Sequence, residues 1–167
     1  AANVGAALQN AQLYQETQRR ANEMSALTEV GREISATLEL GTVLERIATH
    51  ARDLLKGDNS AVFLPDNGGQ TLKTIVAVGD IAPQLKETTI QLGQGIIGDL
   101  AQRGEAEIIN DVSHDTRVIQ IPGTPEHEEE RLLITPLLTG ERVIGMMAVC
   151  RVGPGPRFTQ ADLDFLT

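Results

Sequence analysis

The chain has 167 residues, enough for one domain with a hydrophobic core and too few for two ordinary domains. Its 23 acidic residues outnumber its 14 basic residues, the formal net charge is −9, and aromatic residues make up only 2%. Because this charge repels a phosphate backbone and few rings are present to stack on bases, the composition argues against nucleic-acid binding. The single Cys150 excludes an intramolecular disulfide framework. No apolar run reaches the roughly 20 residues of a membrane span, so we expect a cytoplasmic protein without direct membrane insertion.

Residues 1–38 contain no Pro and are dense in Ala, Gln, Glu, Arg and Leu, which predicts one long helix. Residues 15–20 are polar on every face, so this part of the helix cannot be packed in a core. An apolar seam follows at spacings typical of a helix, and it packs either on the domain's own sheet or on another chain. For the second alternative, a homodimer through the N-terminal helices, the candidate residues are Met24, Leu27, Ile34 and Leu38.

Gly41 interrupts the apolar pattern, and residues 42–56 resume it, which predicts a second, amphipathic helix. The broad apolar face of this helix comprises Val43, Leu44, Ile47, Ala48, Ala51, Leu54 and Leu55. Residues 60–64 are apolar on both alternating faces, as is typical of a central strand covered on both sides. A turn-rich segment, 65–70, then leads into the apolar segment 72–78, so the two strands are predicted to form a hairpin.

The glycine-rich segment 92–112 predicts a strand, a short helix ending at Gly104 and a strand over 107–110. Residues 93–98 also satisfy the dinucleotide pattern G-x-G-x-x-G. That fingerprint requires a parallel strand before it and an acidic residue about 20 positions later, whereas this motif follows a hairpin and two helices. The glycines are therefore interpreted as turn and packing residues. The helix that starts near Gln94 still presents unpaired backbone N–H groups and a positive dipole end, which suit an anionic or carbonyl-bearing ligand.

The segment 111–131 carries two Pro and a run of Glu and predicts a long irregular loop, a length that is usually functional or disordered. Segments 132–138 and 143–152 predict two further strands joined through a turn at Gly140. Thr159 and Asp162 resemble a capping box and predict a helix from Gln160. Because the chain starts and ends within predicted helices, we expect it to be a segment of a longer protein.

Several residues are candidate reactive or metal-ligating groups. Asp111, His114 and Asp115 have a spacing compatible with a metal, and His127 with Glu130 would complete such a site. Loops carry the same residues for turn formation alone, and no thiolate or paired-His motif supports a metal here. Cys150 alternates with apolar residues on a predicted strand, which favours a buried, unreactive thiol. No nucleophile triad, phosphate-binding loop or pair of catalytic carboxylates is present, so we predict that the fragment is not an enzyme.

The order of these segments resembles a GAF domain, the small-molecule-binding sensory module of many signalling proteins. The resemblance covers residues 24–167, and residues 1–23 resemble the helix that closes a preceding module. The resemblance depends on the order and spacing of five sequence features. These are the predicted helical residues from 26–30 through 54–55, the strand 60–64, the glycine motif 93–98, the segment 109–112, and the pair 136–138 with 143–146.

The resemblance implies an α+β fold, with a central antiparallel sheet of about five to six strands, terminal helices on one face and a ligand pocket on the other. The helix near Gln94 and the loop 111–131 would roof this pocket. The candidate ligand-binding residues are Gln94, Gly95, Ile96, Ile97, Asn110, Asp111, His114, Arg117 and Thr135.

The sequence departs from the specialised subfamilies of this fold. The loop holds no Cys to attach a bilin, the signature of cyclic-nucleotide-binding members is not visible, and one Cys cannot supply the chemistry of free-methionine-sulfoxide reductases. The cofactor is thus unknown, and the partner is an unidentified small molecule. The resemblance implies a sensory domain of a multi-domain signal-transduction protein, such as a histidine kinase or a cyclase. The alternative is a dimerisation and relay module whose pocket is filled by its own side chains.

Overall fold

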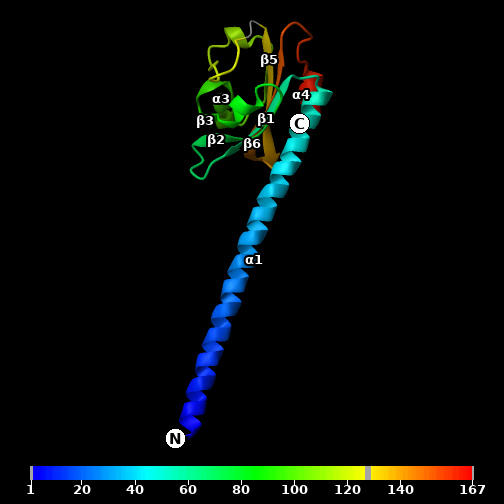
Figure 1. The fold of residues 1–167 in the computed structure, drawn as a ribbon. Helices are drawn as coiled ribbons and strands as arrows, with labels where there is room; N and C mark the ends of the chain where they lie inside the picture. Colours follow the sequence, from blue (N-terminus) through cyan, green and yellow to red (C-terminus); the bar gives the residue numbers. More distant parts are fainter. Residues whose placement is uncertain (1, 127–128, 167) are drawn as a thin grey trace. The chain divides into compact units, whose positions relative to one another are not determined.

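A computed structural model of the chain describes residues 2–126 and 129–166, without the side chains of residues 2–5 and 25–38. The chain forms two compact units, residues 1–40 and residues 41–167, and each is described by itself. Helix α1 (Ala2–Leu54) supplies the whole first unit and the beginning of the second (Figure 1). Among the described residues, no helix is both long enough and apolar enough to cross a membrane.

The prediction of two separate helices before the first strand is wrong, because α1 runs through Gly41 without a break. One Gly within a helix costs only about 1 kcal/mol relative to Ala, and the residues on both sides of Gly41 favour the helix. Apart from the neighbouring backbone of α1 itself, no described atom lies within 4 Å of where a Cβ on Gly41 would be, so the described contacts do not require Gly here.

In the first unit, the described side chains of residues 6–24 are all exposed, as the polar character of residues 15–20 predicts. Met24 is 71% exposed. The side chains of Leu27, Ile34 and Leu38 lie outside the described residues, so the candidate dimer seam stays a prediction. The predicted boundary between residues 23 and 24 falls within α1, and it also stays a prediction.

The second unit is an α+β domain around one antiparallel sheet of six strands in the order β3-β2-β1-β6-β5-β4. The strands are β1 (Asn59–Pro65), β2 (Thr71–Val78), β3 (Thr89–Gln91), β4 (Glu107–Ile109), β5 (Glu130–Thr139) and β6 (Arg142–Val152). The helical elements of this unit after α1 are α2 (Ala82–Lys86), α3 (Gly95–Arg103), the 3-10 turn η1 (Val112–His114) and α4 (Gln160–Leu166). The two predicted hairpins, β1 with β2 and β5 with β6, are confirmed, and β1 is central as expected.

One face of the sheet is covered by the last turns of α1 and by α4, as predicted. The broad apolar face predicted for residues 42–56 divides into two parts. Leu44, Ala48 and Ala51 are buried against Val62, Met147 and Val149 of the central strands, whereas Val43, Ile47 and Leu54 are exposed. The helix α4 begins with the predicted capping box, in which the backbone N–H of Thr159 donates to Asp162 Oδ2 at 2.8 Å.

The opposite face of the sheet packs against α3 (Figure 1). Phe63 from β1 and Met146 from β6 form the centre of this second cluster together with Leu100 of α3. Because successive residues of a strand face opposite sides, β6 places Met146, Ala148 and Cys150 on this face and Met147 and Val149 on the other. Each central strand is therefore buried on both sides, which explains its continuous apolar sequence.

Candidate ligand cavity

A cavity of about 420 Å³ lies on the α3 face of the sheet. Its floor is formed by β1 and β6, its walls by α2, β3 and the start of α3, and its roof by residues 118–125 of the long loop. The volume falls in the range of about 300 to 1,000 Å³ that is typical of small-molecule sites.

The hollow exists because small residues meet on the floor. Ala61 of β1 lies directly opposite Ala148 of β6, and both line the cavity. Directly opposed residues on neighbouring antiparallel strands have Cβ atoms roughly 5 Å apart, so two methyl groups here leave space that two larger side chains would fill. Phe63 of β1, which is almost completely buried, also lines the cavity.

Three glycines position α3 over this floor. Gly93 and Gly95 have φ angles of 80° and 68°, in the left-handed region that favours Gly. At Gly98, a Cβ atom would lie 2.2 Å from the carbonyl oxygen of Gln91, so only Gly lets α3 approach β3 this closely. The interpretation of the G-x-G-x-x-G motif as turn and packing residues is therefore confirmed, as is the left-handed cap at Gly104, with φ of 66°.

The first turn of α3 borders the cavity. Gln94, Gly95, Ile96 and Ile97 all line it, and Gln94 caps the helix without a side-chain hydrogen bond to its first turn. The unpaired backbone N–H groups of a helix start carry a positive partial charge of about half a unit. Of the candidate ligand-binding residues, these four are the ones that the structure brings together at the cavity.

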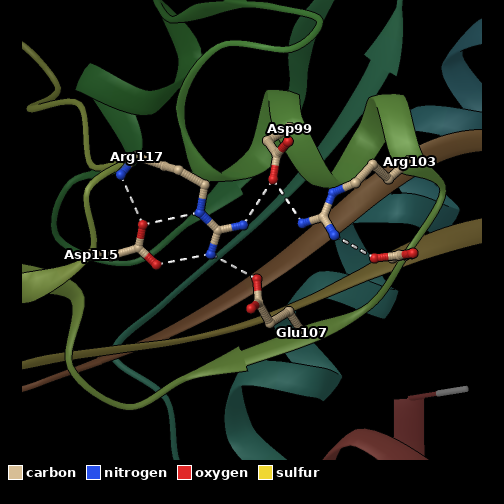
Figure 2. A network of polar contacts seen from close by, with 6 residues as sticks. Asp99, Arg103, Glu107, Asp115 and Arg117 are labelled. Atoms are coloured by element: carbon tan, nitrogen blue, oxygen red, sulfur yellow. Dashed lines mark hydrogen bonds and ion pairs between the residues drawn. The ribbon is translucent and has the colours of Figure 1, made fainter.

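Arg117 does not line the cavity but ties down the loop that roofs it (Figure 2). Its guanidinium donates to Asp99 of α3 at 2.9 Å, to Glu107 of β4 at 2.8 Å and to Asp115 at 2.8 Å. The residue directly after it, Val118, begins the lining segment. Arg117 therefore connects the roof loop to the helix and strand beside it.

This network shifts the acid–base equilibria of its members. Hydrogen bonds from Arg117 hold the pKa of Asp115 below its ordinary value. The pKa of Asp99 is also lowered, first by Arg117 and then by Arg103, which lies on the same helix at 2.7 Å (Figure 2). The same carboxylates raise the pKa of Arg117, which keeps its positive charge at every accessible pH.

The other candidates lie away from the cavity lining. The side chain of Asn110 spans to Phe158, accepting from its N–H at 2.9 Å and donating to its carbonyl at 3.1 Å, so it anchors the entry to α4. Asp111 pairs with the exposed His114 at 2.9 Å. Thr135 is 2% exposed and alternates on β5 with Ile134 of the α3 face, so it points toward the terminal helices. Ligand contacts by these residues stay predictions.

The sequence did not place several polar residues at the cavity, and Asn59, Glu130 and Cys150 are among them. Asn59 is the first residue of β1, and its Oδ1 accepts a hydrogen bond from the N–H of Ile81 at 3.3 Å. The sequence indicated Glu130 only as a candidate metal ligand, whereas the structure places it on the cavity lining. Cys150 is buried, as expected, and burial raises the pKa of its thiol well above the ordinary value. The alternation of Cys150 with Ala148 was the signal that could have placed it on the cavity floor.

No group of three or more potential metal ligands occurs among the described residues, and His127 lies outside them. Metal coordination by Asp111, His114 and Asp115 therefore has no geometric support within the described part of the chain.

The sequence model of the GAF domain matches residues 39–167, which include the whole sheet and the cavity. The chain belongs to the GAF domain family. Comparison with curated protein sequences gave no significant match. Among solved structures, this GAF domain is similar to the GAF domain of a phosphoenolpyruvate-protein phosphotransferase from Acinetobacter, with TM-score 0.64 and 23% identity over 76% of this chain and 74% of that one.

Two further structures show how widely this fold is used. A methyl-accepting chemotaxis protein aligns with TM-score 0.62 and 20% identity over 75% of this chain and 80% of its own. A type II free methionine-R-sulfoxide reductase from Thermoplasma acidophilum aligns with TM-score 0.62 and 16% identity over 78% of this chain and 86% of its own. At these identities the likeness concerns the fold. GAF domains are sensory and regulatory modules of signalling proteins, and most are not catalytic.

Proposed function

We propose that this GAF domain is the small-molecule sensor of a multi-domain signal-transduction protein. The observation that carries the proposal is the cavity of about 420 Å³ between the sheet and α3. It is large enough for a small molecule, and it is bordered by a loop and a short helix that can adjust when a ligand enters. A pocket filled by the domain's own side chains, the alternative expected from the sequence, would leave no such space.

The route from the cavity to the output runs through the sheet. On β6, Ala148 and Cys150 face the cavity, whereas Met147 and Val149 pack against α1 and α4. At the end of this strand, Arg151 donates to the carbonyl oxygen of Leu55, directly after α1, and its guanidinium lies 4.0 Å from the ring of Phe158. A ligand that shifts the strand would thus act on the helices that leave the domain, which is the coupling that a sensor requires.

The parent protein is proposed to be a cytoplasmic histidine kinase that works as a homodimer. One protein of similar fold is a methyl-accepting chemotaxis protein, which supports a signalling context, and another is the GAF domain of a phosphoenolpyruvate-protein phosphotransferase. Expressing the natural reading frame on both sides of the domain and assaying autophosphorylation with ATP would test the kinase part. A parent that carries no phosphate on histidine would contradict it.

Ligand binding is tested by a thermal-shift screen of cyclic nucleotides, haem, amino acids, amines and fatty acids, with each hit measured by calorimetric titration. The matched variants are Ala148→Leu, which fills the floor of the cavity, and Ala161→Leu, the same change on the exposed surface of α4. A true ligand binds the wild type and Ala161→Leu alike and loses most of its affinity for Ala148→Leu. If no compound binds the wild type at millimolar concentration, the sensor proposal is wrong.

Dimerisation is a second candidate function, favoured by the exposed Val43, Ile47 and Leu54 on α1 and by Met24 on the same helix. GAF domains commonly dimerise. Light scattering over a concentration series should give the mass of a dimer, and Met24→Glu should shift the equilibrium toward monomer. A strict monomer at high concentration would remove this function and leave the ligand proposal standing.

A further inference from the structure

The charged side chain that the described residues contribute to the cavity lining is negative. Among its described lining residues none is Lys, Arg or His, and the one carboxylate is that of Glu130. Most of the remaining lining residues are Ile, Leu, Val, Pro or Ala. Proteins bind phosphates and carboxylates with Arg, Lys or clusters of backbone N–H groups, so an anionic ligand would find no side-chain cation among the described lining residues.

Arg117 does not change this balance, although it lies near the roof loop. Its guanidinium is already bonded to three carboxylates. With Arg103 and Glu105 included, the network in Figure 2 sets two arginines against four carboxylates, so its overall charge is negative. The net charge of −9 for the whole chain adds to the same field, which attracts cations and repels anions.

The polar end of the cavity is defined by strand register. Cys150 of β6 lies opposite Asn59 on one side and Leu132 on the other, and Glu130 lies opposite Val152. Glu130, Cys150 and Asn59 therefore meet at the same end of the sheet, and all three line the cavity. Among the described residues, the hydrogen bond to the Glu130 carboxylate comes from the Cys150 thiol, with Sγ at 3.4 Å from Oε1.

This hydrogen bond leaves most of the hydrogen-bond acceptor capacity of the Glu130 carboxylate unfilled. A carboxylate can accept about four hydrogen bonds, and a thiol is a weak donor. Burial keeps Cys150 protonated, so it neither adds a second negative charge nor neutralises the first. A positively charged or strongly donating group of a ligand would satisfy the remaining acceptor positions.

Within the described part of the cavity, the start of α3 favours negative charge, so its partial charge has to be compared with the charge of Glu130. A helix N-terminus presents about half a unit of positive charge, which falls off within the first turn. Glu130 carries a full formal charge. The helix start thus suits a neutral carbonyl or hydroxyl group, while the carboxylate determines the sign of the ligand.

We propose that the cavity binds a largely apolar molecule that carries a protonated amine, with the ammonium group bonded to Glu130, and that it rejects phosphates and carboxylates of similar shape. This inference depends on the proposed ligand-binding function and narrows it to one chemical class. Hydrogen bonds between charged partners are stronger than neutral ones, so Glu130 supplies selectivity while the apolar walls supply most of the affinity.

A matched set of amphiphiles tests the charge preference directly. Octylammonium, 1-octanol and octanoate share one alkyl chain and differ in the charge of the head group, and each is titrated below its critical micelle concentration. We expect octylammonium to bind tightest, and octanoate to bind at least about tenfold more weakly. Glu130→Gln should weaken octylammonium binding about three- to tenfold and leave octanol unchanged. The control is Glu129→Gln, which removes a neighbouring exposed carboxylate that does not line the cavity.

The outcomes separate this inference from the general function. Octanoate binding as tightly as octylammonium, or Glu130→Gln leaving the preference intact, would make the proposed ligand class wrong. The same holds if Ala148→Leu binds octylammonium as well as the wild type does. An anionic compound from the screen that is lost in Ala148→Leu would also overturn the ligand class, but it would support the sensor. Only the failure of every compound would overturn both.

Discussion

The two faces of the sheet use alanine in opposite ways. On the face covered by α1 and α4, the helix face, Ala48 and Ala51 belong to α1 and let it lie closely on the large residues of the central strands. On the cavity side, Ala61 and Ala148 belong to the sheet itself, and the elements above them are held at a distance. The same small side chain thus closes one interface and opens the other. What decides the result is whether the covering element can approach the floor.

The covering elements differ for a physical reason. The last turns of α1 are part of a regular helix that settles into the strand side chains. The roof of the cavity includes an irregular loop whose position depends on the ion pairs of Arg117. We therefore expect the helix face to respond to substitutions as a packed core and the cavity face to respond as an adaptable site.

The largest effect is expected on the helix face, from Leu133→Ala. Leu133 is 0% exposed, and truncation leaves a void that the surrounding strands and helix cannot fill. The free energy of unfolding should fall by about 3 kcal/mol, measured by urea denaturation. Leu138→Ala on the same strand, where the side chain is 55% exposed, is the matched control and should change it little. Equal losses for the two variants would contradict the comparison.

A smaller loss is expected when the same truncation is made at the cavity. Leu85 of α2 is buried and lines the cavity, so Leu85→Ala enlarges an existing space rather than creating a void in a packed region. The expected loss is about 1 to 2 kcal/mol, because the cost of truncation depends on the new empty volume. Denaturation in urea provides the measurement. A loss as large as that of Leu133→Ala would show that the two faces are packed alike.

Arg117→Met should loosen the roof loop more than it destabilises the domain. The side chain is 25% exposed, and ion pairs at such positions are weak, so the expected loss of unfolding free energy is about 1 kcal/mol. The backbone amides of residues 118–121, 123 and 124 should exchange their hydrogen faster than in the wild type. Arg103→Met removes two ion pairs but no contact to the loop, so the exchange of these amides should stay unchanged.

The pH dependence of this variant follows from the lowered pKa values of Asp99 and Asp115. A carboxyl group with a lowered pKa in the folded state stabilises the fold above its unfolded pKa, and this contribution is lost as pH falls through the folded value. The stability difference between wild type and Arg117→Met should therefore persist at neutral pH and shrink below about pH 4. A difference that grows on acidification would contradict the ion-pair explanation.

The smallest effect concerns His114, which is exposed. Its hydrogen bond to Asp111 raises the pKa of the imidazole above the ordinary value of about 6.5. A raised pKa stabilises the folded state below the unfolded pKa, and the contribution disappears as pH rises through the folded value. In an NMR titration, Asp111→Asn should lower the pKa of His114, with no measurable change in unfolding at pH 8. An unchanged titration would show that the pair does not form in solution.

The sequence predicted most of the fold because its signals are local. A continuous apolar segment identified β1 as a central strand, the turn residues identified both hairpins, and Thr159 with Asp162 identified the start of α4. The family followed from the order of these segments. The predicted break at Gly41 was wrong, because the residues on both sides favour the helix and outweigh the low helix propensity of one Gly. The short helix α2 was missed as well, because five residues carry too little periodicity to detect. The strand expected at the start of segment 92–112 lies slightly earlier, as β3.

The residues of the candidate site also differ in whether local sequence could identify them. The glycine-rich turn identified Gln94 to Ile97 as the start of a helix because this pattern is local, and the resemblance to a GAF domain implied that this helix borders the pocket. Asn59, Glu130 and Cys150 are far apart in the chain and meet only through the pairing of β1, β5 and β6. The face of the sheet on which Thr135 lies also depends on strand register, since a shift of one residue along a strand moves a side chain to the other face. The sequence alone thus determined the elements and the family, whereas the charge and shape of the cavity were decided by strand register, which only the tertiary structure provides.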